Sequence, residues 1–366
     1  MSIDIEALLA GPRGRRLMLE LALAAGCGPG RDGDELAGAV MLAAYRLDPG
    51  RGTSRVMFGP GAAQVDTAMP SPAEVAALLD DACITVPDEG SLLQALDRAV
   101  ASARYWQEPD GEDALAATPA VLAALAPIAA QIAASPHAAW WSEGVARDDQ
   151  WQVHWDEGAG GTPPAESAGA SEALEMWRSR TIAGEERARR ERPTDPEARW
   201  GGQWWSTPPH TLLRTTRGLG ELGPAGLWLE EDSSGWDRAT TRAVSVADGV
   251  RVYEIDGAQA WADLCRGHPL GVTAEKRHDW YRTTGRAGDW VIPDWSRVAS
   301  SYDAVHLTVG GYLAAAGTPI EVDEATSSVI GGWAPDETFW LCDVGQARGP
   351  DETWVHDADR GWGRTR

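Results

Sequence analysis

Apolar residues recur every three to four positions through most of the first 140 residues, and this spacing predicts helices. One helix is expected across residues 92–103, whose leucine and valine side chains share a face. Ser71–Glu74 has the form of a capping box with a proline at the first helical position, so it is expected to open another helix. Thr118 is expected to open a third helix that bends at Pro127. Residues 54–58 have the composition of a short strand.

After residue 198 the pattern changes to short runs rich in β-branched and aromatic residues, which predict strands. Few helical stretches separate these runs, so we expect an α+β fold with a mainly antiparallel or mixed sheet rather than a doubly wound parallel one. The predicted strands are Thr211–Thr215, Gly226–Glu230, Arg251–Asp256, Trp290–Ile292, Ala304–Val309, Pro319–Val322, Ser328–Gly331 and Thr338–Cys342.

The 366 residues are enough for two domains of roughly 150 residues each. Residues 1–156 are expected to form a mostly helical N-terminal domain, and residues 198–366 a Trp-rich α+β domain that carries any active site. Residues 157–197 are expected to be a linker with a charged helix. Residues 157–170 are rich in Gly, Ala and Pro, and residues 171–192 place Glu and Arg four positions apart, as in an exposed helix.

The formal net charge of −23 limits the partners of the chain. Phosphate backbones and anionic membrane surfaces repel such an acidic protein, so neither nucleic acid nor a membrane is expected as a partner. The apolar runs are shorter than the ~20 residues that a membrane span needs, and the N-terminus lacks the apolar stretch of a signal peptide. The four cysteines are scattered without a CxxC pair, which is typical of reduced thiols in a cytoplasmic protein.

The composition excludes several kinds of chemistry. The chain contains no Asn, and Lys276 is its only lysine among 32 Lys and Arg residues, a bias typical of a high-GC bacterial gene. Mechanisms that need an Asn are excluded, as is Schiff-base chemistry on any lysine except Lys276. None of the seven histidines lies in an HExxH motif or pairs with Cys at ligand spacing, so no metal is expected.

Tryptophan is unusually frequent, with 19 copies, none of them before Trp106. Several lie in short segments that also contain Asp, Arg or His, a combination that suits a planar ring or a sugar as ligand. The alternative is that the indoles fill the core, since the chain has only two Phe residues. If a site exists, its expected walls are Trp205, Arg214, Tyr281, Trp295, His306 and Trp333.

Gly218–Gly223 matches the GxGxxG pattern and follows a predicted strand. The dinucleotide fingerprint also needs a helix to start after the second glycine, so that the helix N-terminus meets the pyrophosphate. Here Pro224 and a strand-like run follow instead. The segment is therefore predicted to be a flexible or tight loop and not a dinucleotide site.

Asp303–Tyr312 resembles the C-terminal Asp-x-x-His block of SGNH (GDSL-type) hydrolases. The resemblance implies that Asp303 orients His306, which activates a serine. The chain has neither the Gly-Asp-Ser start nor the oxyanion-hole Asn of that family. In a strand, moreover, side chains at positions 303 and 306 point to opposite faces. We therefore reject the block as evidence for that family and keep a Ser/His hydrolase only as a third hypothesis.

The order of features in the second half is similar to that of ADP-ribosyltransferase-like domains, in which an Arg, a Ser/Thr strand and a late acidic residue surround NAD. Arg214 lies on an early predicted strand and Arg217 follows that strand, and the strand-like residues 226–230 precede the Thr-rich residues 239–241. The acidic residues 321–324 come late in the chain. The resemblance implies NAD as a substrate and no resident metal.

The resemblance also implies roles for single residues. Arg214 would hold the phosphates of NAD, and Thr240 or Thr241 would order the pocket. Glu321 or Glu324 would stabilise the positive charge that develops on the ribose as nicotinamide leaves. With His306 these residues make the expected catalytic set, and the expected substrate-binding residues are Trp205, Arg217, Tyr281, Trp295, Asp303 and Trp333.

Two functions from different classes therefore stay open. The first is an ADP-ribosyltransferase-like transferase, or NAD glycohydrolase, acting on NAD or a related ribosyl donor. The second is a non-catalytic protein that binds a partner through the helical N-terminal domain, with the Trp-rich domain as a stable support. A single concave site that contains Asp303, His306 and Arg214 favours an enzyme, whereas three separate surfaces favour the second hypothesis.

Overall fold

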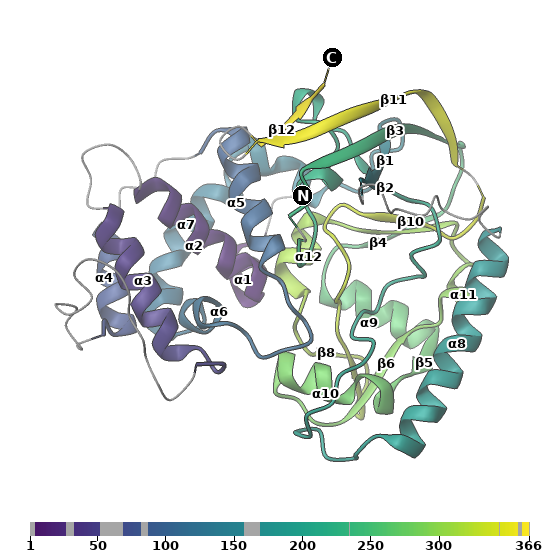
Figure 1. The fold of residues 1–366 in the computed structure, drawn as a ribbon, viewed down its shortest axis with the longest axis horizontal. Helices are drawn as coiled ribbons and strands as arrows, with labels where there is room; N and C mark the ends of the chain where they lie inside the picture. Colours follow the sequence, from purple (N-terminus) through teal and green to yellow (C-terminus); the bar gives the residue numbers. More distant parts are fainter. Residues whose placement is uncertain are drawn as a thin grey trace.

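The computed structural model describes residues 4–26, 33–51, 69–81, 87–156, 169–233, 235–343, 345–357 and 361–365. The fold is α+β, as the sequence predicts, with a helical unit beside a unit that contains two sheets (Figure 1). The strand expected at residues 54–58 and most of the expected linker lie outside the described residues.

The helical unit is centred on its second helix, which contacts five of its neighbours. Leu17, Met18 and Leu19 of this helix are buried. The helix predicted over residues 92–103 is present, and the one predicted from Thr118 includes Pro127. The elements are α1 (Ile5–Ala10), α2 (Pro12–Gly26), α3 (Gly33–Leu47), α4 (Pro72–Asp81), α5 (Glu89–Ala101), α6 (Gly111–Ala116), α7 (Pro119–Ala133) and the 3-10 helix η1 (Pro136–Ser142).

Helix α4 begins with the predicted capping box. The Ser71 N–H donates to Glu74 Oε2 over 2.7 Å, and the Glu74 N–H donates to Ser71 Oγ over 3.3 Å. Ser71→Ala is expected to lower the free energy of unfolding by about 1 kcal/mol, because the Glu74 N–H loses its acceptor. Urea unfolding checks this beside Ser179→Ala, the same change at an exposed position inside a helix. An equal loss in both variants would contradict the capping role.

The second unit contains most of the strands. They are β1 (Gln150–Trp155), β2 (Arg214–Arg217), β3 (Arg238–Val246), β4 (Val252–Ile255), β5 (Pro269–Gly271), β6 (Asp289–Pro293), β7 (Ala304–Leu307), β8 (Ile320–Glu321), β9 (Thr326–Ser328), β10 (Thr338–Trp340), β11 (Gly345–Asp357) and β12 (Gly361–Arg364). Its helices are α8 (Ala170–Glu191), η2 (Gly220–Leu222), η3 (Ala225–Leu227), α9 (Ala258–Gly267), α10 (Thr273–Thr284), α11 (Trp295–Val298) and α12 (Val309–Ala315).

The larger sheet has the strand order β12-β11-β3-β1-β2-β10-β7-β4. Its neighbours pair antiparallel except for β4 and β7, which run parallel, so the sheet is mixed. Strand β1 lies between β3 and β2. The structure therefore differs from the boundary expected after residue 156, because residues 150–155 form a central strand of the second unit.

The charged helix α8 packs against α10 and α11 of the second unit and is not an isolated linker helix. Its Trp177 and Ile182 contact the core of the smaller sheet, which has the order β5-β6-β9-β8. Both oxygens of the buried Glu185 carboxylate accept N–H groups at the start of α10. A negative charge at a helix N-terminus is favourable, which explains a buried carboxylate on a helix expected to be exposed.

Four aromatic side chains form the centre of the second unit. Trp261, Trp295 and Trp333 pack against one another with ring centroids 5.7–6.0 Å apart, and Phe339 lies 5.2 Å from Trp333. Each is almost fully buried. At these positions the indoles fill the core, which is the alternative that the scarcity of Phe favours.

The strand prediction was wrong for the residues that follow the Gly218–Gly223 loop. Residues 225–227 form a 3-10 turn instead of a strand, and Ala225 and Leu227 are buried in it. The chain bends back here, because Gly218 and Pro224 form an isolated bridge and Gly223 adopts a φ of 78°. The loop predicted for this motif is thus confirmed, and it is a tight one.

No single helix in the described ranges has the length and apolarity needed to cross a bilayer. One pair, α7 with η1, meets the criteria of length and composition when taken together, but it is bent by 91° at its break.

Candidate functional site

The residues that the ADP-ribosyltransferase resemblance implies do not come together. Arg214 on β2 pairs with Glu337, with 3.1 Å between Nη1 and Oε1. Glu321 lies on β8 of the other sheet, and Glu324 follows it in an exposed turn. In Figure 1, β2 lies in the upper part of the second unit and β8 in the lower part. The guanidinium and these two carboxylates therefore share no cleft in this structure.

Other expected site residues lie inside the core and line no cleft. The Trp295 indole N–H donates to the Ser206 carbonyl, and the Trp333 indole N–H to the Glu337 carbonyl, both over 3.2 Å. Thr241 Oγ1 accepts the Trp354 indole N–H over 3.1 Å and has no exposed surface. The expectation that these residues line a ligand site was wrong, because the polar group of each side chain forms a hydrogen bond within the core.

Asp303, which precedes β7, and His306 within β7 bind different partners. Asp303 forms a bidentate pair with Arg251 at the surface. His306 is buried and contacts Glu254 and Asp336. Asp303, His306 and Arg214 thus have three separate sets of partners and are not joined by hydrogen bonds or ion pairs.

His306 belongs to a buried ion cluster, which we define as Glu143, Arg217, Glu254, His306 and Asp336. His306 Nδ1 lies 2.5 Å from Glu254 Oε2, and its Nε2 lies 3.4 Å from Asp336 Oδ1. Arg217 binds Asp336 through Nε over 2.7 Å and Glu143 through Nη1 over 3.1 Å. Only Glu254 and Glu143 have substantial exposure, so the cluster is a structural element of the interior.

The ion cluster attaches the segment that leaves the helical unit to the large sheet. The Gly144 carbonyl accepts from Arg217 Nη2 over 2.9 Å, and the Val145 N–H donates to Glu254 over 3.1 Å. The guanidinium also lies 5.0 Å from the centroid of the Trp140 ring. A cation over an indole is attractive, and more so where water is excluded.

The charges of the ion cluster set its protonation. Burial by itself lowers the pKa of His306, but hydrogen bonds to Asp336 and Glu254 and their charges outweigh burial and raise the pKa to about 9. Burial raises the pKa of Asp336 and Glu254, but the bonds and charge of His306 hold both values below the ordinary range. At neutral pH His306 is therefore a cation shared by two carboxylates.

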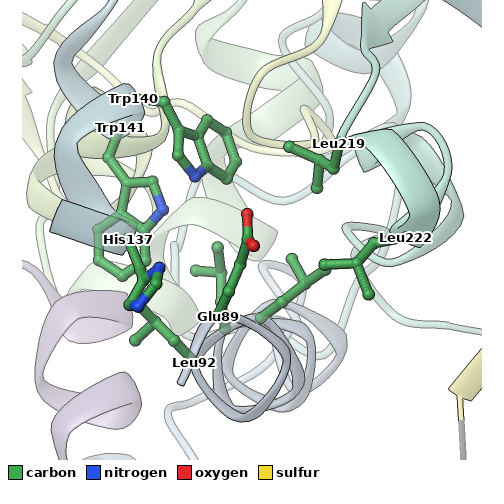
Figure 2. Close-up of a pocket in the computed structure, with 9 residues that line it drawn as sticks. Glu89, Leu92, His137, Trp140, Trp141, Leu219 and Leu222 are labelled. Carbon is green, nitrogen blue, oxygen red and sulfur yellow. The ribbon is translucent and has the colours of Figure 1, made fainter. Parts of the chain in front are cut away.

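Trp140, whose ring contacts the Arg217 guanidinium, also lines a crevice (Figure 2). The start of α5, the helix η1 and the turn η2 enclose it. Its free space is about 10 Å³, which is room for about one water molecule. Its lining residues are Glu89, Leu92, Leu93, Leu96, His137, Trp140, Trp141, Leu219 and Leu222.

A larger groove, of about 330 Å³, opens on the face of the large sheet. In the strand register Trp151 of β1 and Arg348 of β11 both pair with Ala243 of β3. Directly opposed residues of antiparallel strands point to the same face. The methyl group of Ala243 therefore lies between the side chains of Trp151 and Arg348, whose strands are about 10 Å apart, or two strand spacings. This methyl group forms the floor of the groove.

The turn η3 covers part of this sheet face. Gly226 of η3 lies against Val153 and Thr216. Thr216 pairs with Trp151 across the sheet, and Val153 lies two residues after Trp151 on β1. The register of β11 shifts between Arg348 and Glu352, and both residues line the groove. An irregularity of the strand pairing thus lies at the groove.

Polar groups surround the groove. Asp148, Asp149 and Glu352 line it beside Arg348. Asp149 accepts the Trp151 indole N–H over 2.6 Å and so fixes that ring, and Glu352 pairs with Arg364 over 2.8 Å. Within the described ranges, neither Asp148 nor Arg348 has an ion-pair partner. The groove therefore offers a held indole, a carboxylate and a guanidinium.

Residues 278–282 on α10, which combine Trp280 with His, Asp, Tyr and Arg, have a structural role. Side chains of α10 bind backbone groups of an extended strap, residues 193–206. The Trp280 indole N–H donates to the Trp204 carbonyl over 2.7 Å, and Arg282 Nη1 donates to the Trp200 carbonyl over 2.8 Å. Tyr281 donates to Glu197 over 2.9 Å. We see no cleft at residues 278–282 within the described ranges.

Lys276, the only lysine of the chain, also binds the strap. Its Nζ donates to the carbonyls of Gln203 and Trp205 over 2.8 and 2.7 Å, and the side chain is almost fully buried. Burial lowers the pKa of Lys276 to about 8, against the raising effect of nearby carboxylates. Trp205, an expected substrate-binding residue, therefore contributes a carbonyl to a structural contact.

Sequence reasoning missed the groove residues and Glu254, Asp336 and Glu143 of the ion cluster. Trp151 belongs to the Trp-rich region, but its neighbours across the sheet are far from it in the sequence. Among the described residues no group of His, Cys, Asp or Glu is placed to hold a metal ion. The chain matches no protein-family model, no curated protein and no solved structure.

Proposed function

We propose that the protein binds an uncharged sugar ring in the groove between Trp151 and Arg348. The observation that carries the proposal is the row Trp151–Ala243–Arg348, in which a methyl floor between two large side chains leaves a cavity of about 330 Å³. This volume falls within the range of about 300–1,000 Å³ that is usual for small-molecule sites.

The chemistry of the groove favours a ring with hydroxyl groups. An indole presents a flat apolar surface on which the C–H face of a sugar packs. Ionised Asp148 only accepts hydrogen bonds, and Arg348 only donates them, so the two match the mixed donor and acceptor character of hydroxyls. Asp148, Asp149 and Glu352 repel a phosphate, which disfavours nucleotides.

Ribosyl transfer from NAD has less support as a function of this chain. It needs Arg214 free for phosphates and a carboxylate at the ribose, but Arg214 pairs with Glu337, Glu321 lies on the other sheet, and Glu324 lies in the turn that follows Glu321. The hypothesis stays a prediction, and the titration below includes NAD to test it.

The proposal is tested by titrating the intrinsic Trp fluorescence with glucose, galactose, mannose and N-acetylglucosamine, and separately with NAD and AMP. We expect a saturable response to at least one sugar. Trp151→Ala is expected to weaken that binding about two- to tenfold, since aromatic contacts contribute about 0.5–1.5 kcal/mol beyond the area they bury. Trp200→Ala is the matched control, because Trp200 is 42% exposed and lies on the strap.

Two results would overturn the proposal. One is the absence of a response to all four sugars, by fluorescence and by thermal shift, which detects any ligand that binds the folded state. The other is an equal loss of affinity in Trp151→Ala and Trp200→Ala. Saturable binding and cleavage of NAD, abolished by Glu321→Gln or Glu324→Gln, would support ribosyl transfer instead.

We also propose a cytoplasmic location. The support is that Cys265 and Cys342, the cysteines within the described ranges, are both free thiols. Free thiols are usual in the reducing cytosol. Purification from the native host followed by fractionation tests this, and recovery in a secreted fraction would contradict it.

A further inference from the structure

A second surface, separate from the groove, surrounds the mouth of the crevice. Its apolar part is made by Trp140, Leu219 and Leu222, which are half-buried. The floor beneath is filled by leucines of α5 that belong to the core. Because the free space inside is so small, any occupant lies across the mouth and does not enter.

The Glu89 carboxylate points between Trp140 and the turn η2, at the centre of this mouth (Figure 2). Glu89 is the first residue of α5 and is exposed. Exposed Glu143 follows η1, and exposed Glu221 lies within η2. The nearby guanidinium of Arg217 is buried and already bound to Glu143 and Asp336. The surface therefore carries apolar groups inside an acidic rim.

Trp140 already accepts one guanidinium in this chain, that of Arg217, at 5.0 Å from its ring centroid. An indole attracts a cation at either face. An arginine side chain places methylene groups on apolar surface while its charged end stays in water or meets a carboxylate. Leu219 and Leu222 supply the apolar surface, and Glu89 the carboxylate.

We propose that the mouth of the crevice is a docking surface for a basic segment of a partner protein, anchored by an arginine. The guanidinium pairs with Glu89, and its methylene stem packs on Leu219 and Leu222. The net charge of −23 draws such a segment in from a distance, while the apolar contacts and Glu89 fix its position. This surface serves a partner whether or not the groove binds a sugar.

The test uses a fluorescently labelled 12-residue peptide of alternating Arg and Leu, and the same peptide with citrulline in place of Arg. Citrulline keeps the length and shape of Arg and removes the charge. Binding is measured by fluorescence anisotropy at physiological salt. Glu89→Gln is expected to weaken binding of the Arg peptide about tenfold, the usual size for loss of a hydrogen bond to a charged group. The citrulline peptide is expected to bind wild type and variant equally.

Glu186→Gln is the matched control, since it removes the same charge from an exposed position on α8. Equal weakening by Glu89→Gln and Glu186→Gln would reduce the effect to overall charge and overturn the proposal. Equal affinity of wild type for the two peptides, or no binding of the Arg peptide, would also overturn it. Leu222→Ser, which keeps the charge, is expected to weaken both peptides, and no effect of this variant would contradict the apolar contact.

Discussion

Arg217→Met is expected to lower the free energy of unfolding by about 3–5 kcal/mol, the usual cost of breaking a buried ion pair. Methionine fills much of the space of the arginine stem but leaves buried Asp336 without its guanidinium partner. It also removes the hydrogen bond to the Gly144 carbonyl, which attaches the end of η1 to the sheet. Arg217 and Asp336 are both buried, so water does not compensate the loss of the ion pair between them.

The measurement is urea unfolding, followed by Trp fluorescence and by circular dichroism. Arg242→Met is the matched control, because Arg242 pairs with Asp351 at the surface, where both side chains are about 40% exposed. An exposed pair contributes about 0–1 kcal/mol, so this variant is expected to be near wild type. If the two variants lose the same amount, the ion cluster does not hold the units as we describe.

The pH dependence of stability is the second large expected effect. The pKa of His306 is about 9 in the folded protein and 6.5 in its ordinary state. Because folding raises this pKa, protonated His306 contributes to the stability of the folded protein. The contribution is fully present below pH 6.5 and is lost as the pH rises through 9. A difference of this size corresponds to about 3 kcal/mol. The wild type is therefore expected to lose this stability between pH 6.5 and pH 9.

His306→Gln isolates this contribution, since it removes the titrating group and keeps a side chain that forms hydrogen bonds. Other groups also titrate: burial raises the pKa of Glu231 to about 8 and lowers that of Lys276 to about 8. Both remain in the variant, so they cancel in the difference between the two proteins. That difference in stability is expected to shrink by about 3 kcal/mol from pH 6.5 to pH 9. A constant difference would contradict a charged His306 in the folded state.

The helices were predicted well because their signals are local. The capping box at Ser71 and the leucine spacing of α5 need no information from distant residues. Strands β1, β3 and β11 were missed for the opposite reason. Strand β3 has the sequence RATTRAVSV, in which polar residues predominate, and it forms because β1 and β11 pair with it on both sides. Such pairing depends on residues far away in the sequence.

The candidate site was less predictable than the fold. Trp151 and Arg348 lie almost 200 positions apart, and only the register of three strands brings them to one groove. The residues singled out by family resemblance have an order along the chain that is similar to the family pattern. That order does not decide which sheet a strand joins, and Arg214 and Glu321 join different ones. The sequence did not distinguish tryptophans of the core from tryptophans of a binding surface, because an indole is suited to both places.

The central place of β1 in the large sheet has a consequence for synthesis of the protein on the ribosome. Strand β1 emerges before β2 and β3, its two neighbours in the sheet. At about 5–20 residues per second, the roughly 80 residues between β1 and β3 take on the order of 4–17 s to appear. Both edges of β1 are open until β2 appears, and the edge that pairs with β3 stays open until the end of this interval. Open edges pair readily with other chains. The nascent chain is thus open to aggregation through this edge while residues 156–237 are being translated. Slow translation of these residues prolongs the exposure, and a chaperone bound to β1 during this time protects the chain.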